Sequence, residues 1–275
     1  MKTNTHQALL PGKSIGVITR VFAHAEEDVA HRVSMTMHLL EQIFTLEMAH
    51  KVQVLIPMNP AFADYCDCGF TRQALVKALH GKLWAGKVAV TASTRCHPGS
   101  LLNYGVAALS TDWVWVVSPE CINGVLEHQD VLSEISRAAK ESASVVGFQF
   151  SGLEETTALG IVPGRCAFWR RIPLMEAGGF LSLFDFTLRQ RTKKLLGDSK
   201  CIPSNEEGLT ILRMLETSPG IRTAILRPIR YQTPPEPSAQ DRLARIAENK
   251  TRSLVTMVKE LGGDMSRLRS SLISI

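Results

Sequence analysis

The chain has 275 residues, of which 45% are hydrophobic and 21% are charged, and its formal net charge is +5. That length and apolar content are enough to bury a sizeable core in one large domain, or in one domain plus an appendage. The mild positive balance suits phosphate-bearing ligands or an anionic surface. Because no long block of Lys and Arg is present, no nucleic-acid partner is expected.

The sequence shows no targeting or membrane-spanning signal. Residues 1–14 lack the apolar run of a secretory signal, and no stretch approaches about 20 uninterrupted apolar residues. Six cysteines in a chain of this length indicate reduced thiols rather than a dense disulfide framework. We therefore expect a cytoplasmic protein.

Taken in chain order, apolar β-branched runs alternate with helical patterns. Runs typical of buried strands lie at residues 14–21, 51–57, 87–91, 112–117 and 144–150. Helical spacing of apolar residues separates them, at residues 26–48, 73–83, 100–109 and 131–142. This alternation predicts right-handed βαβ crossovers, and hence an α/β fold with a mostly parallel, Rossmann-like sheet flanked by helices.

The regular alternation breaks after Phe150, where Gly, Pro and Arg punctuate residues 152–184. A further helix is predicted at residues 206–216 and a last strand at residues 222–227. The run TPPEP at residues 233–237 fits neither a helix nor a central strand, so it is interpreted as a linker.

The predicted organisation is therefore one α/β domain at residues 1–232, a linker at 233–237 and an amphipathic helical tail at 238–275. Apolar residues line one side of the tail helix and basic residues the other. Such a helix is expected to pack on the domain or on a second subunit, which would make a homo-oligomer. Peripheral contact with an anionic membrane is the less favoured alternative.

Residues at or just after the carboxyl ends of the predicted strands are candidates for ligand binding, because ligands of open α/β sheets bind beyond those ends. These residues are Thr19, Arg20, Asn59, Arg95, His97, Ser118 and Glu120.

Three segments resemble family 2 glycosyltransferases in their order and spacing. Residues 103–108 (NYGVAA) lead into the apolar run at 112–117, like the helix-to-strand segment of that family. Residues 164–180 are similar to its Arg-Arg to Gly-Gly-Phe segment, and residues 205–213 (NEEGLTILR) stand where it has an acidic motif followed by Arg. The resemblance covers residues 14–231.

This resemblance implies a GT-A fold and the transfer of a sugar from a nucleotide-diphosphate donor to an acceptor hydroxyl. Glu206 or Glu207 would be the general base, which needs a carboxylate within hydrogen-bond reach of the hydroxyl. The register of the motif leaves both open. The substrate-binding residues implied are Thr19, Arg20, Asn59, Arg95, His97, Ser118, Arg170 and Arg171.

One departure from the family concerns its metal. Where the family places the Asp-x-Asp motif that binds a divalent cation, this chain has Ser118-Pro119-Glu120. Mg²⁺ and Mn²⁺ favour carboxylate and phosphate oxygens, so Glu120 is the candidate metal ligand. Three alternatives stay open: Glu120 holds Mg or Mn with the donor phosphates, basic side chains replace the metal, or catalysis is lost. The basic side chains considered are Arg20, Arg95, Arg165, Arg170 and Arg171.

Each candidate also has a purely structural interpretation. Residues 178–180 fit a turn followed by a core aromatic residue. Arg170 and Arg171 fit a solvated surface pair, and Glu206 and Glu207 fit the first turn of a helix. A second functional hypothesis is a non-catalytic GT-A-like binding or scaffolding protein that oligomerises through its tail. A nucleotidyltransferase is a third and less favoured one, because no Gly-rich basic loop follows the first strand.

Overall fold

The computed structural model describes residues 13–21, 26–57, 68–93, 98–126, 131–150, 166–180, 206–218, 220–229 and 272–273. Its strands are β1 (Ile15–Arg20), β2 (Lys51–Pro57), β3 (Val88–Ser93), β4 (Trp113–Val117), β5 (Val145–Phe150), β6 (Cys166–Arg170), β7 (Thr223–Ile229) and β8 (Leu272–Ile273). Its helices are α1 (Glu26–Thr45), α2 (Cys68–Leu79), α3 (Pro98–Ala108), α4 (Ile122–Leu126), α5 (Val131–Lys140), α7 (Arg171–Glu176) and α9 (Glu206–Thr217), with two 3-10 turns, η1 (Ala85–Lys87) and η2 (Pro119–Cys121). None of these described helices has the length and apolar content needed to cross a membrane.

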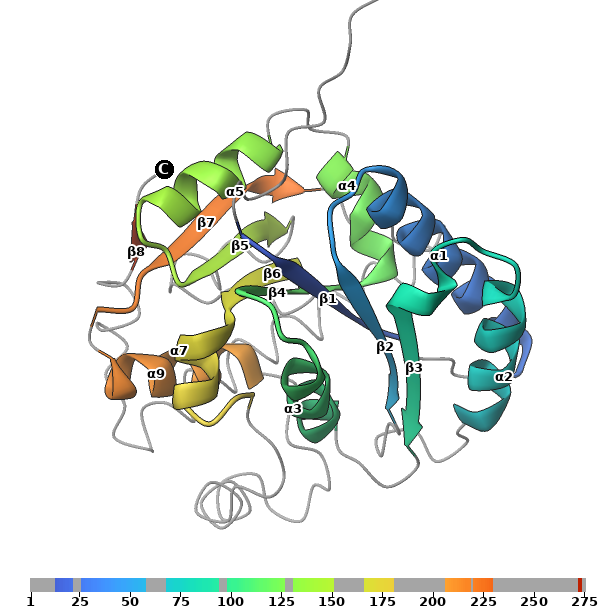
Figure 1. Cartoon of the computed structure of the whole chain (residues 1–275). Helices are drawn as coiled ribbons and strands as arrows, with labels where there is room; N and C mark the ends of the chain where they lie inside the picture. Colours follow the sequence, from blue (N-terminus) through green and yellow to red (C-terminus); the bar gives the residue numbers. More distant parts are fainter. Residues whose placement is uncertain are drawn as a thin grey trace, which may run out of the picture.

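The strands form one sheet in the order β3-β2-β1-β4-β6-β5-β7-β8. Every neighbouring pair is parallel except the two made by β6, which runs antiparallel to both β4 and β5. Figure 1 shows the twisted sheet with helices on both sides. The predicted α/β class, with a mostly parallel Rossmann-like sheet flanked by helices, is confirmed.

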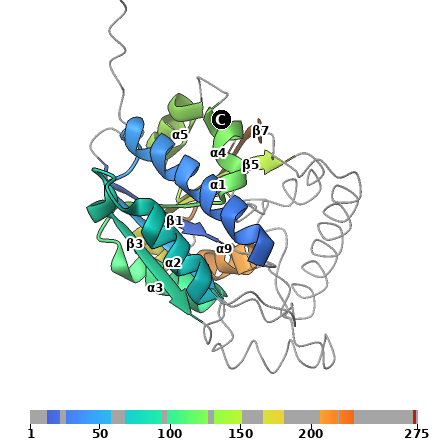
Figure 2. The same ribbon diagram turned by 90° about the vertical axis from the view of Figure 1, so that its right-hand side faces the viewer.

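Helices cover both faces of the sheet because strand residues alternate between two apolar layers. Val17 belongs to the layer beneath α1, α2, α4 and α5, and its neighbour Ile18 belongs to the layer beneath α3, α7 and α9. Figure 2 shows α1 and α2 side by side over the first layer. In the second layer α3 lies close to the sheet, since a Cβ at Gly105 would be 3.0 Å from Ile18 Cδ1. This close approach fixes the position of α3.

Aromatic contacts hold β6 against β4. Trp115 and Phe168 lie directly opposite each other across the two strands, with ring centroids 4.8 Å apart and planes 11° apart. Trp115 Nε1 donates to Cys166 Sγ at 3.4 Å. Burial raises the pKa of the Cys166 thiol to about 12, so this sulfur stays neutral and acts as a weak acceptor.

Three features differ from the predicted elements. β6 and α7 form where the alternation breaks in the sequence, and α2 begins at Cys68 rather than at residue 73. Leu272–Ile273, in the predicted helical tail, instead form β8 and pair with Thr223 and Ala224 of β7. Such pairing satisfies backbone groups that an edge strand leaves open. Residues 230–271, with the predicted linker and tail helix, lie outside the described residues.

At the amino-terminal edge of the sheet, Asp112 ties the start of β4 to the start of β1. The backbone N and the Oγ of Ser14 both donate to Asp112 Oδ2 at 2.8 Å. The backbone bond, then the hydroxyl bond, holds the pKa of Asp112 below its ordinary value, because both stabilise the charged carboxylate.

Replacing Asp112 with asparagine is expected to lower the free energy of unfolding near neutral pH by about 1 kcal/mol or less, because the residue is exposed. Since the pKa is lower in the folded state, the advantage of the wild-type protein is full above the unfolded pKa of about 3.9. It is lost as the pH falls through the folded pKa. Urea unfolding midpoints of both proteins across this range test the prediction, which fails if the difference widens as the pH falls.

Candidate functional site

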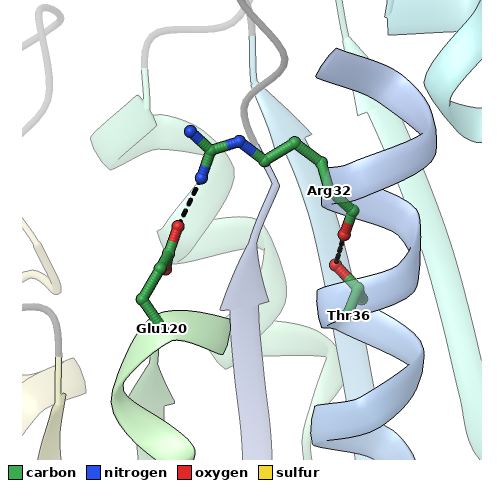
Figure 3. Close-up of polar contacts among 3 residues, drawn as sticks. All are labelled: Arg32, Thr36 and Glu120. Atoms are coloured by element: carbon green, nitrogen blue, oxygen red, sulfur yellow. Dashed lines mark hydrogen bonds and ion pairs between the residues drawn. The ribbon is translucent and has the colours of Figure 1, made fainter. Parts of the chain in front are cut away.

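The carboxyl ends of β1 and β4 are neighbours in the sheet, and an ion pair lies beside them. Glu120 follows β4 in η2, and Arg32 lies on α1, the helix that follows β1. Arg32 Nη1 donates to Glu120 Oε1 at 2.5 Å, as Figure 3 shows. The pair joins residues 88 positions apart and bridges the two segments that leave this edge of the sheet.

Local backbone structure presents Glu120 to α1. Ser118 is extended (φ −80°, ψ 142°), and Pro119 then opens η2 in place of a longer strand. The Cys121 backbone N donates to Ser118 O at 3.0 Å, which closes the turn. The chain therefore bends directly after β4, so that Glu120 meets Arg32 instead of continuing along the sheet.

The ion pair is partly buried. The side chains of Arg32 and Glu120 are 23% and 14% exposed, so solvent screens their attraction less than at an open surface. Arg32 Nε is buried and has no hydrogen-bond partner among the described residues. The guanidinium thus donates to Glu120 through Nη1, while its buried Nε–H finds no acceptor in the described part of the chain.

The described residues do not fit a Mg or Mn site built on Glu120. Within the described ranges no group of three or more His, Cys, Asp and Glu side chains lies close enough together to hold a metal ion. Glu120 already accepts a charge-assisted bond from Arg32. A hard divalent cation would need several oxygen ligands, and here it would have to compete with a guanidinium for one of them.

A second cluster joins three segments far apart in the sequence. Asn103 on α3 accepts from Phe180 N at 2.6 Å and donates through Nδ2 to Phe180 O at 2.7 Å. Arg213 on α9 donates through Nη2 to Gly179 O at 2.5 Å. We call Asn103, Gly179, Phe180 and Arg213 the Asn–Arg cluster. It ties α3, the turn after α7 and α9 to one another.

Two glycines shape the turn in this cluster. Gly178 and Gly179 have φ of +86° and +76°, a region that residues with a side chain rarely adopt. Their N–H groups donate to Met175 O and Leu174 O at the end of α7, which stops the helix. Phe180 then enters the core, packed edge-on against Trp169 with centroids 5.1 Å apart.

The structure brings together only some of the residues predicted from the sequence. Ser118 and Glu120 follow β4, and Arg20 ends β1 at the same edge of the sheet. Thr19 precedes it but is fully buried on the α1 side, so the expectation that it touches a ligand is not supported. Its Oγ1 has no partner within the described ranges.

Arg170 and Arg171, which the resemblance implied as substrate-binding residues, lie at the opposite edge of the sheet from Glu120. Because β6 is antiparallel, Arg170 pairs with Trp113 at the start of β4. Its guanidinium lies over the Trp113 ring at 5.4 Å and donates to Ala139 O at 3.1 Å. Arg171 donates to Val106 O at 3.2 Å. Both arginines therefore stabilise the fold at the amino-terminal edge.

The other predicted site residues lie partly or wholly outside the described part of the chain. Glu206 and Glu207 open α9, although the placement of their side chains lies outside what is described. Asn59, Arg95 and His97 fall outside the described ranges altogether. Sequence reasoning missed Arg32, because a lone basic residue in an amphipathic helix carries no signal until the fold sets it beside Glu120.

Comparisons with known proteins give matches only among solved structures. No protein-family model matches the chain, and no curated protein does. The chain is similar to S. aureus TarS in complex with UDP-GlcNAc at 14% identity and a TM-score of 0.49, over 83% of this chain and 60% of TarS. It is similar to M. tuberculosis glucosyl-3-phosphoglycerate synthase at 14% identity and a TM-score of 0.46, over 92% of this chain and 82% of that one.

A third match is a 4-diphosphocytidyl-2C-methyl-D-erythritol synthase from Anaerococcus prevotii, at 9% identity and a TM-score of 0.42, over 78% of this chain and 89% of that one. The chain thus spans less than two thirds of TarS and most of the other two. At such identities and TM-scores, these matches do not identify an activity for this chain.

Proposed function

We propose that this chain is a glycosyltransferase with a GT-A-like domain, which moves a sugar from a nucleotide-diphosphate donor to an acceptor hydroxyl. The observation that carries the proposal is the Asn–Arg cluster. Asn103, Phe180 and Arg213 come from the three segments that resemble family 2 glycosyltransferases, and they meet through hydrogen bonds that span 77 and 34 residues. A chance resemblance between separate short motifs gives no reason for those motifs to bind one another.

The cluster also suggests which carboxylate acts as the base. Arg213 lies seven residues after Glu206, about two helical turns, so helical periodicity sets position 206 on the same face of α9 as Arg213. Position 207 lies about 100° further round. Because α9 runs back toward the start of β7 (Figure 1), its first turn points toward the carboxyl ends of the strands, where a donor would bind. We therefore favour Glu206 over Glu207.

Turnover with a panel of uridine and guanosine diphosphate sugars, measured with Mn²⁺ and with EDTA, tests the activity. Once a donor is found, Glu206→Gln is expected to lower kcat by about 10²–10⁴-fold, because the acceptor hydroxyl loses its general base. Glu207→Gln should have a smaller effect. Glu176→Gln, at an exposed carboxylate on α7, is the matched control and should leave kcat unchanged. If Glu206→Gln behaves like this control, the assignment of the base is wrong.

The non-catalytic alternative keeps one specific observation in its favour, the ion pair that occupies Glu120. It predicts that a nucleoside diphosphate binds while no donor in the panel is turned over, with or without Mn²⁺. The same experiments therefore separate a transferase from a binding protein.

A further inference from the structure

We propose that Arg32, held in place by Glu120, replaces a divalent cation as the counter-charge for the donor's diphosphate, so that nucleotide binding at this edge needs no metal. This inference rests on the proposed function and names the chemistry of its donor site. It concerns a residue that the resemblance does not assign.

Glu120 is already engaged by Arg32. Its Oε1 already accepts from Arg32 at 2.5 Å, and its side chain is only 14% exposed. If Glu120 turned to a metal ion, Arg32 would be left partly buried without its carboxylate, which is costly. Glu120 is therefore better suited to orient the guanidinium than to bind a cation.

Arg32 has more N–H donors than its bond to Glu120 uses. A guanidinium has five N–H donors in a planar fork that matches phosphate oxygens bidentately. Nη1 points to Glu120, while Nε is buried without a partner among the described residues. Since one edge of the fork is fixed by Glu120, less side-chain entropy is lost when the other donors bind phosphate.

The pair also lies at the edge of the sheet where a donor would bind. Arg32 and Glu120 stand beside the carboxyl ends of β1 and β4, the edge where α/β sheets bind nucleotides. Arg20, the last residue of β1, places a second guanidinium at the same edge. Arginine clamps stabilise the charge that develops on phosphate groups in transfer reactions, which is the role a metal plays elsewhere.

The test is isothermal titration of the full chain with UDP and with GDP, in EDTA and in Mn²⁺. The wild-type Kd is expected to change by less than about threefold between the two conditions. Arg32→Met should weaken binding by at least about tenfold in EDTA, and Arg32→Lys by less, because the ammonium keeps the charge without the fork. Arg72→Met, at an exposed arginine on α2, is the matched control and should bind like the wild type.

A double variant controls for loss of folding, since Arg32→Met alone leaves Glu120 without its ion-pair partner. Arg32→Met with Glu120→Gln removes both charges and should bind as weakly as the single variant, with thermal unfolding confirming a folded protein. If binding requires Mn²⁺ and is insensitive to Arg32→Met, the inference is overturned while the proposed function stands. If neither nucleotide binds in either condition, the proposed function itself fails.

Discussion

Replacing Gly179 with alanine is expected to lower the free energy of unfolding by about 3 kcal/mol. Gly179 has φ of +76°, which costs a residue with a Cβ about 1–2 kcal/mol. The added Cβ would also lie 2.4 Å from Asn103 Oδ1, so Asn103 must move and release the backbone N and O of Phe180. Leaving such groups unsatisfied adds a cost of about 1–3 kcal/mol. Urea unfolding monitored by tryptophan fluorescence measures the difference.

Gly178→Ala is the matched control for this prediction. Gly178 has a similar φ of +86°, but a Cβ there would meet nothing closer than Arg213 Cζ at 3.8 Å, an ordinary contact. Its expected loss is therefore the conformational cost alone, about 1–2 kcal/mol. Equal losses for the two variants would mean that the Asn103 bonds contribute nothing measurable, and the Asn–Arg cluster would no longer support the proposed function.

Most of the sheet could be predicted from the sequence because its strands are buried on both faces and read as continuous apolar runs. The run at residues 51–57 matches β2 to the residue, and the acidic residues at 26–28 mark the start of α1. β6 was missed for a physical reason. Its five residues insert antiparallel between β4 and β5, and local periodicity contains no sign of which strands a short apolar run pairs with.

The candidate site was predictable only in part. Glu120 was identified because the loop after a strand is where ligands of α/β sheets bind. Its partner Arg32 was not, since the pair depends on how α1 packs against η2 across 88 residues. Arg170 was assigned to the substrate site from the resemblance alone, and the antiparallel course of β6 places it at the other edge of the sheet.

Replacing Trp115 with alanine is expected to lower the free energy of unfolding by about 3–5 kcal/mol. Trp115 is fully buried and stacks on Phe168 directly across from it, so its loss opens a cavity where β6 joins β4. Trp84 provides the matched control. It stacks on Phe44 in nearly the same geometry, with centroids 4.9 Å apart and planes 18° apart, but it is only half-buried.

If burial rather than stacking supplies the energy, Trp84→Ala should cost only about 1–2 kcal/mol, since its ring stays partly in water in both states. Trp115→Phe keeps the stack and loses the bond to Cys166 Sγ, so it should fold with a smaller loss and remain measurable if Trp115→Ala does not fold. Chemical unfolding of the three variants distinguishes the two explanations. Similar losses for Trp84→Ala and Trp115→Ala would show that stacking dominates, and that β6 is not held chiefly by the buried surface it shares with β4.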